Sequence, residues 1–293
     1  MAKVALITGG ASGMGLAVAK ALAARGDWDI HVLDINEERG AEVARDVPRT
    51  TFHRANVTKY DELGAAFQQA FQKDGRLDFV FANAGVIERG NFYASPPDGD
   101  AVSPPPEPDM LSIDADLKGV VLTSYLAQHY FRNSPHKGNG ANIVMTASCG
   151  GLYATYSAPM YSAAKFGVVG FMRSISRHFK TCGTRVNAIC PSVVRTNLID
   201  PAAWDSFPKD RFVNVDTVVQ VVLQLLDGGE PAGQGLSDTL GNHRPLDKLH
   251  GLAVEVSDIG FYFRDQHTFA DEGMRQVMDA TAVENQVGSV LNV

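Results

Sequence analysis

The stretch KVALITGGASGMGLAVAKALAARG, residues 3–26, decides the fold. An apolar run over residues 3–8 predicts a buried strand, and the apolar positions that follow Gly15 recur at helical spacing. Gly9, Gly13 and Gly15 occupy the turn between these two elements. Such a turn lets the backbone approach a pyrophosphate, for which the N-terminus of the helix supplies positive potential. The stretch therefore predicts a dinucleotide-binding unit.

The alternation of strand and helix continues along the chain. Apolar runs predict further strands that end at Asp34, Asn56, Asn83 and Ser148, and segments with helical periodicity separate them. The run TRVNAICPS predicts a sixth strand, and residues 234–242 predict a seventh. Strands that alternate with helices form a parallel, doubly wound sheet. The predicted fold class is therefore α/β, with a single Rossmann-type seven-stranded sheet and helices on both faces.

Asp34 is predicted to select the cofactor. In doubly wound sheets ligands bind at the carboxyl ends of the strands, and a carboxylate about 20 residues beyond the glycine turn usually binds the adenosine ribose 2′-hydroxyl. The same charge repels the extra phosphate of NADP. Ile35 adds no basic side chain that could hold that phosphate. Asp34 could also simply begin the next helix, a role that is compatible with ribose binding. The expected cofactor is therefore NAD.

A proton-transfer group is predicted in SCGGLYATYSAPMYSAAK, residues 148–165. Tyr161 and Lys165 are four residues apart, so in a helix they share one face, and an ammonium near a phenol favours the phenolate. Ser148 ends a strand, where its hydroxyl can bind a substrate oxygen. A Tyr-x-x-x-Lys pair alone is usually a surface pair on a helix. The assignment therefore depends on the strand ends around it.

Composition limits the class of protein. Of the 293 residues, 45% are hydrophobic, which supports a sizeable core. The formal net charge of −7 argues against nucleic acid or an anionic membrane surface as a partner. There is no apolar span of about 20 residues, and the N-terminus reads as a strand instead of a signal peptide. The three cysteines have no metal-ligand spacing, so we expect a cytoplasmic protein with reduced thiols and no metal.

The domain organisation is predicted as follows. Residues 1–244 form one dinucleotide-binding and catalytic domain. Within it, residues 86–108 contain six prolines and no regular period, which predicts a surface loop over the active-site edge. This loop either contacts the substrate or is an insertion of no consequence. Residues 245–293 form a C-terminal extension that packs on the same domain or on a partner subunit, covering a substrate pocket.

The chain resembles the short-chain dehydrogenase/reductase family over roughly residues 3–242. Five motifs carry the resemblance in the family's order and spacing, namely TGGASGMG, FANAG, the serine, YSAAK and VNAICPS. The segments LDIN, NAICP and YSAAKFGVVGFMRS are most similar to the NAD-dependent 15-hydroxyprostaglandin dehydrogenase type and to fungal alcohol dehydrogenases. The resemblance implies NAD(H)-dependent interconversion of a secondary alcohol and its ketone. It makes Tyr161 the general acid/base, while Lys165 lowers the tyrosine pKa and Ser148 positions the substrate oxygen.

The resemblance also implies a set of cofactor-binding residues. They would line the phosphates, hold the adenosine, lie beneath the cofactor and contact the nicotinamide. The expected set is Gly9, Ser12, Gly13, Met14, Gly15, Asp34, Ile35, Asn56, Val57, Asn83, Ala84, Gly85, Tyr161, Lys165, Pro191, Val194 and Thr196.

The sequence departs from the family pattern at three positions. Asp116 occupies the position of the usual asparagine, and an ionised aspartate only accepts hydrogen bonds. In the family this position helps shape a water relay to the active-site lysine. Asp116 could keep that water, or it could form an ion pair that alters the pH profile. Alternatively, the main-chain carbonyl does the family's work and the side chain has no role in it. Ser192 replaces a glycine, and Asn56 replaces an aspartate at the adenine site.

The substrate is predicted to be a bulky hydrophobic secondary alcohol or ketone. Aromatic residues before the tyrosine and after the sixth strand suggest a broad apolar pocket, although half of them could be core. The apolar helix over residues 217–226, together with the tyrosine helix, suggests a homodimer or homotetramer. Alternative functions are an NADP-dependent ketone reductase, a non-redox cyclase or isomerase, and a binding protein on the same scaffold. The expected pocket residues are Cys149, Tyr153, Tyr156, Ser192, Trp204 and Phe207.

Overall fold

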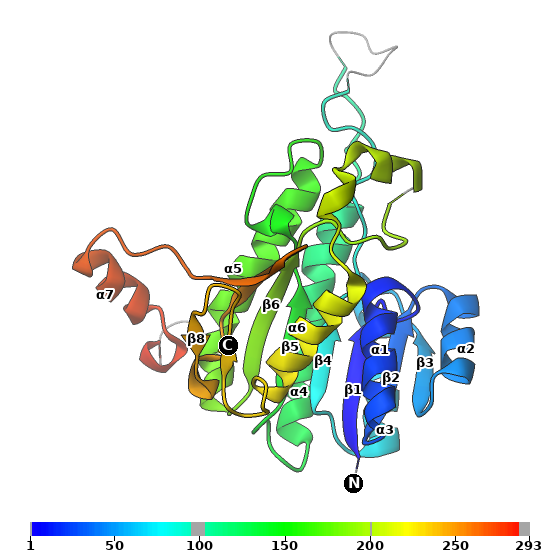
Figure 1. Ribbon diagram of the computed structural model, residues 1–293, viewed down its shortest axis with the longest axis vertical. Coiled ribbons are helices and arrows are strands. Elements are labelled where there is room, and N and C mark those ends of the chain that lie inside the picture. The colour runs from blue at the N-terminus through cyan, green and yellow to red at the C-terminus, as the bar shows by residue number, and fades with distance from the viewer. Residues whose placement is uncertain (1, 95–102, 200, 287–293) are drawn as a thin grey trace.

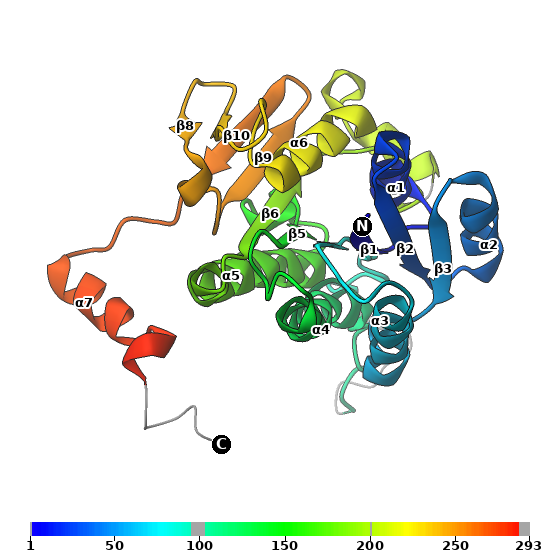
Figure 2. The same cartoon turned by 90° about the horizontal axis from the view of Figure 1, so that it is seen from below.

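The computed structural model describes residues 2–94, 103–199 and 201–286. One eight-stranded sheet lies at its centre, and β10 is its only antiparallel member in the described residues. From one edge to the other, the strands follow the order β10-β9-β6-β5-β4-β1-β2-β3, of which Figure 1 shows β6 to β3 and Figure 2 adds β9 and β10. Their bounds are β1 Lys3–Thr8, β2 Trp28–Asp34, β3 Thr50–Arg54, β4 Phe79–Ala82, β5 Asn142–Thr146, β6 Arg185–Pro191, β9 Ala253–Ser257 and β10 Gly260–Arg264.

Helices cover both faces of the sheet (Figure 2). The α-helices are α1 Gly13–Arg25, α2 Glu37–Asp46, α3 Tyr60–Asp74, α4 Gly119–Asn133, α5 Pro159–Thr181, α6 Val215–Asp227 and α7 Glu272–Ala280. The short helices are η1 Ile113–Lys118, η2 Cys149–Gly151, η3 Pro201–Ser206, η4 Lys209–Arg211, η5 Leu246–Lys248 and η6 Val283–Asn285. Within the described ranges, no helix combines the length and the apolar character that a membrane crossing needs. The observed architecture confirms the predicted α/β class and Rossmann-type sheet, which has eight strands instead of the predicted seven and is mostly, not wholly, parallel.

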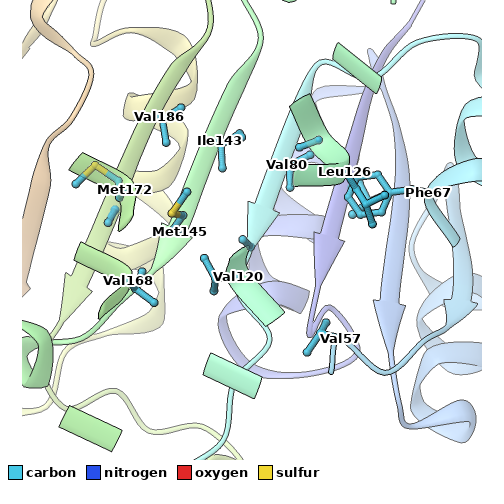
Figure 3. Close-up of a cluster of buried hydrophobic side chains, with 14 of the residues drawn as sticks. Val57, Phe67, Val80, Val120, Leu126, Ile143, Met145, Val168, Met172 and Val186 are labelled. Atoms are coloured by element: carbon cyan, nitrogen blue, oxygen red, sulfur yellow. The ribbon is translucent and has the colours of Figure 1, made fainter. Parts of the chain in front are cut away.

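The core consists of two layers, one on each face of the sheet. Successive side chains of a strand point to opposite faces, so Val4 and Leu6 join the layer under α3, α4 and α5, whereas Ala5 and Ile7 join the layer under α1 and α6. Figure 3 shows part of the first layer, in which Ile143 of β5 belongs to the same cluster as side chains from the helices. Burial of both faces explains why the strands read as continuous apolar runs.

The seventh parallel strand was predicted in the wrong place. Within residues 234–242, only Leu236–Ser237 form a strand, β7, which pairs with β8 (His243–Arg244) in a separate two-stranded sheet. Gly235 and Gly241 have φ values of 90° and 81°, a left-handed conformation that interrupts a strand. The central sheet is instead completed by β9, which pairs in parallel with β6. A domain boundary at residue 244 would therefore cut the sheet before its last two strands.

The helical segment before β5 is not uniform. Its first part, η1, has π-helical geometry, and the regular helix α4 begins only at Gly119. π-helical turns often occur at functional sites, because the wider turn changes the direction of its side chains. Asp116 lies in this turn and is completely buried. Of the loop expected over residues 86–108, the middle part, residues 95–102, lies outside the described residues.

The C-terminal extension contains the helix α7. Figures 1 and 2 both show it beyond α5, to the side of the sheet. Two ion pairs connect this part of the chain to α5, from Arg177 to Asp279 at 3.2 Å and from Arg177 to Glu284 at 2.7 Å. Both pairs are largely exposed, and exposed ion pairs contribute little to stability.

Two truncations should separate the roles of the C-terminal segments. A chain ending at residue 264 loses mainly exposed contacts, so its free energy of unfolding should fall by about 1 kcal/mol or less. A chain ending at residue 244 loses Val254, Val256 and Phe263 from the core. Each such side chain contributes about 1.5–3 kcal/mol on burial, against a total stability of about 5–15 kcal/mol. Urea unfolding followed by circular dichroism should show a cooperative transition only for the longer chain, and equal stability of the two would contradict this assignment.

Candidate active site

Two neighbouring cavities open at the carboxyl edge of the sheet. The larger, of about 280 Å³, follows the turn after β1 and the ends of β2, β3 and β4. The smaller, of about 80 Å³, contains Ser148, Tyr161 and Lys165. The two cavities share lining residues, so they adjoin each other, and together they make up a cleft from the end of β2 to α5. The shared residues are Met14, Asn83, Gly85, Thr196 and Leu198.

The turn between β1 and α1 leaves backbone donors at the floor of the larger cavity. Ser12 precedes the helix in an extended conformation, and its side chain makes no capping hydrogen bond. The first N–H groups of a helix lack partners within the helix and are suited to bind an anion. Gly9 has a φ of 64°, and a Cβ atom there would lie 2.8 Å from Ala84 Cα. The glycine is therefore required for the close contact between this turn and the end of β4.

Gly15 lies in the turn but lines neither of the two cavities, so its contact with the phosphates stays a prediction. A Cβ atom at this position would lie 2.3 Å from the carbonyl oxygen of Gly9 and 2.8 Å from Asn83 Nδ2. The absence of a side chain therefore allows α1 to pack against the turn after β1 and the end of β4. All the other members of the expected cofactor-binding set line one of the two cavities.

Asp34 is held in a fixed orientation at the far end of the cleft. Its Oδ2 accepts a hydrogen bond from the N–H of Ala11 at 3.1 Å, and its Oδ1 accepts one from Asn36 at 3.0 Å. These two bonds connect the glycine turn to the start of α2. Each carboxylate oxygen has further acceptor capacity, so the group can still bind hydroxyl donors in the cavity.

Asn83 connects three strand ends beneath the cleft. Its Nδ2 donates to the carbonyl groups of Thr8 and Gly9, at 3.2 and 3.3 Å. Its Oδ1 accepts the hydroxyl of Thr146 at 3.1 Å. The ends of β1, β4 and β5 are thereby fixed relative to one another, which sets the distance between the glycine turn and the residues after β5.

Ser148, Tyr161 and Lys165 meet in the smaller cavity. Tyr161 and Lys165 lie one turn apart on α5, and Ser148 lies directly after β5, where its Oγ accepts the N–H of Gly150 at 3.0 Å. The exposed fractions are 9% for Ser148, 9% for Tyr161 and 3% for Lys165. The Lys165 ammonium lies 5.5 Å from the centre of the Tyr161 ring. A serine hydroxyl, a phenol and an ammonium therefore converge in a site that is largely closed to water.

Asp116 forms a buried ion pair with Lys165. The carboxylate Oδ2 lies 3.2 Å from Nζ, and Oδ1 accepts the N–H of Val86 at 2.7 Å. Nζ donates its aligned hydrogen bond to the carbonyl of Thr146 at 3.0 Å. Within the described residues, Oδ2 accepts no aligned hydrogen bond, so the contact is one of charge. Of the alternatives considered for this aspartate, the structure shows the ion pair.

The ion pair shapes the electrostatics of the tyrosine. Burial raises the pKa of Tyr161, and the charge of Asp116 raises it further, whereas Lys165 and hydrogen bonding to Ser148 oppose the change. Burial also raises the pKa of Asp116 against the effect of Lys165. Burial alone would lower the pKa of Lys165, but the charges of Asp116 and Tyr161 outweigh it and raise the pKa. Lys165 thus lowers the pKa of Tyr161, as expected, but the net pKa of the phenol lies above its ordinary value.

The predicted substrate pocket is only partly assembled around this site. Ser192 lines the smaller cavity, whereas Cys149, Tyr153, Tyr156, Trp204 and Phe207 line neither cavity. Tyr156 is 88% exposed, and Trp204 packs against Phe207 in a tilted arrangement, with 6.3 Å between the ring centres. The Tyr153 hydroxyl donates to Glu255 at 3.0 Å.

Several residues of the site were not predicted. Thr146 contributes a backbone carbonyl, which any residue type could supply, so no sequence signal marks it. Leu198 lies at the junction of the two cavities, and its position in the loop after β6 was its only signal. Glu88 accepts the N–H of Tyr161 at 2.9 Å, a contact between residues 73 positions apart. The described part of the C-terminal extension lines neither cavity, so it does not cover the site in its own chain.

Comparison with protein families gives a match to the short chain dehydrogenase model over residues 3–205. A short-chain dehydrogenase/reductase of Penicillium rubens, prx7, is 71% identical over 282 residues, covering 95% of this chain and 100% of that protein. Human 15-hydroxyprostaglandin dehydrogenase [NAD(+)] is 30% identical over 206 residues, covering 68% of this chain and 70% of that protein.

Solved structures of the same fold include two cofactor complexes. A 3-ketoacyl-(acyl-carrier-protein) reductase from Brucella melitensis, complexed with NADH, aligns with a TM-score of 0.70 and 23% identity, covering 87% of this chain and 97% of that one. A short chain dehydrogenase from Burkholderia cenocepacia, in complex with NADP, aligns with a TM-score of 0.70 and 21% identity, covering 87% and 96% of the two chains. At these identities the likeness concerns the fold.

Proposed function

The chain belongs to the short-chain dehydrogenase family, and from this premise we propose that it is an NAD(H)-dependent oxidoreductase. Its proposed reaction interconverts a bulky hydrophobic secondary alcohol and the corresponding ketone. The observation that carries the proposal is the meeting of Ser148, Tyr161 and Lys165 in a cavity that adjoins the larger one. The cleft has the hydrogen-bonding groups that a dinucleotide needs, with the N–H donors at the start of α1 at one point and the Asp34 carboxylate, an acceptor, at another.

The cofactor supplies the hydride chemistry, and the protein supplies orientation and proton transfer. When bound, the nicotinamide would accept a hydride from the alcohol carbon or donate one to the ketone carbon. Ser148 would hold the substrate oxygen through its hydroxyl. Tyr161 would donate its phenolic proton to that oxygen in reduction and take the proton back in oxidation. Lys165 would stabilise the phenolate and bind the nicotinamide ribose.

The choice of NAD rests on Asp34. A fixed carboxylate would accept the ribose hydroxyls of NAD and would repel a 2′-phosphate. The human relative that carries NAD(+) in its name is consistent with this choice. One observation favours the NADP alternative, because Lys20 and Arg39 line a groove beside the glycine turn. Glu42 and Asp46 line the same groove and offset that positive charge, so NAD remains the proposal.

The proposed substrate class rests on the residues around the tyrosine. Leu198 is an apolar side chain beside Ser148 and Tyr161 that the expected cofactor-binding set does not include. Ligand sites usually combine apolar side chains with a few polar groups that fix the orientation of the ligand, a role open here to Ser148 and Tyr161. The homodimer or homotetramer stays a prediction, as does the covering of a partner's pocket by the C-terminal extension.

Replacement of Tyr161 by Phe tests the reaction type. The variant keeps the ring but cannot transfer a proton, so the rate of NAD reduction should fall by about 10²–10⁴-fold with little change in NAD affinity. Steady-state kinetics with a panel of hydrophobic secondary alcohols, together with calorimetric titration of NAD, provides the measurement. Tyr125→Phe, an exposed tyrosine on α4, is the matched control. Unchanged turnover in Tyr161→Phe would reject the mechanism and favour the non-redox alternatives.

The cofactor choice can be measured through Asp34. The wild-type protein should bind NAD more tightly than NADP. Asp34→Asn keeps an acceptor oxygen but removes the charge, so NAD should bind about five- to tenfold more weakly while NADP binds more tightly. Glu37→Gln removes a nearby exposed carboxylate and serves as the control. Tighter binding of NADP than of NAD by the wild-type protein would overturn the proposal.

Asp116 should set the pH dependence of the reaction. Because the pKa of Tyr161 is raised, alcohol oxidation should increase as the pH rises into the alkaline range, while ketone reduction should persist below it. Asp116→Asn removes the negative charge beside Lys165, so the pKa of the phenol should fall and the midpoint of the oxidation profile should move to lower pH. The profile of kcat/KM against pH is the readout. A midpoint that stays in place or moves upward would show that Asp116 does not act on Tyr161.

A further inference from the structure

The helix that carries Tyr161 begins without a cap of its own. Its N-cap residue is Ala158, which has no side-chain acceptor, and the first helical residue is Pro159. Proline lacks an N–H, so the next two residues, Met160 and Tyr161, carry the N–H groups that have no partner inside the helix. In most helices a serine, threonine, aspartate or asparagine at the N-cap accepts one of these bonds. The acceptor for Tyr161 must therefore come from elsewhere in the chain.

Glu88 supplies this acceptor from a distant segment. Its Oε2 accepts the N–H of Tyr161 at 2.9 Å. This is the bond that an N-cap side chain would usually accept at the third helical position. A carboxylate at the start of a helix is also favoured by the positive end of the helix dipole. Glu88 thus performs for α5 the role that Ala158 cannot perform.

The segment that carries Glu88 is fixed to the active site at a second point. Two residues earlier, the N–H of Val86 donates to Asp116 at 2.7 Å, and Asp116 pairs with Lys165 on the next turn of α5. The short segment from Val86 to Glu88 therefore bridges the ion pair and the backbone of Tyr161. Glu88 lines neither cavity, so its role does not consist of direct contact with a ligand there.

We propose that Glu88 is a positioning residue for Tyr161. It caps the N-terminus of α5 from a distant segment and thereby fixes the position of the phenol in the cavity. The proposal rests on the proposed function, because it gives Glu88 an effect on proton transfer through the tyrosine. A small displacement of a reacting group lowers the rate far more than it lowers binding. Loss of the cap should therefore affect kcat and leave the affinity for NAD unchanged.

The test compares Glu88→Ala with Glu88→Gln in the full-length protein. The alanine variant loses the acceptor, and its kcat should fall by about tenfold or more. The glutamine variant keeps an acceptor oxygen, and its kcat should stay near that of the wild type. Adding Ala158→Ser to Glu88→Ala offers a hydroxyl at the N-cap, so the double variant should recover turnover. Calorimetric titration of NAD and thermal unfolding are recorded for each protein.

Asp61→Ala provides the matched control, because Asp61 is an exposed carboxylate in the first turn of α3. Unchanged kcat in Glu88→Ala would overturn the proposal, as would equal losses in the alanine and glutamine variants. A double variant as slow as Glu88→Ala would also count against capping. Failure of the proposed function gives a different result, since Tyr161→Phe would then retain its turnover.

Discussion

A buried ammonium must be neutralised, and much of the active-site edge depends on how this chain meets that requirement. Lys165 is almost inaccessible to water, and an unpaired charge in such a place is strongly unfavourable. The charge is shared between the carboxylate of Asp116 and the carbonyl of Thr146. These groups belong to η1 and β5, so the lysine holds a π-helical turn, a strand end and α5 together. The carboxylate of Asp116 also opposes formation of the Tyr161 phenolate, because its negative charge raises the pKa of the phenol.

The parts of the fold that follow from local pattern could be predicted from the sequence. Continuous apolar runs mark strands that are buried on both faces, and the glycine turn after β1 has few alternatives. The positions of Asp34, Asn83 and Ser148 at neighbouring strand ends then follow from the parallel order of the sheet. Tyr161 and Lys165 could be assigned to one helix face because their spacing is local. These residues account for most of the cleft.

The remaining features depend on contacts between distant residues. The residue type of Asp116 does not reveal whether it holds water or pairs with Lys165, because that depends on the π-helical geometry of η1. Glu88 lies in a proline-rich segment that has no periodicity, so no sequence pattern connects it to α5. The apolar run of β9 is short and contains Glu255, whereas residues 234–242 have a pattern closer to that of a strand. The aromatic residues after β6 turned out to pack on one another.

The closing pair of strands, β9 and β10, lies outside the region matched by the family model yet reaches the active-site edge. The N–H of Ser192 donates to the carbonyl of Val256 at 2.8 Å, and Glu255 binds both Tyr153 and Arg264. A ribosome delivers the chain from its N-terminus, so the serine, tyrosine and lysine emerge well before these strands. The nascent protein therefore carries these three side chains while one edge of the sheet is still open, and the site is complete only after β9 and β10 have been synthesised and paired.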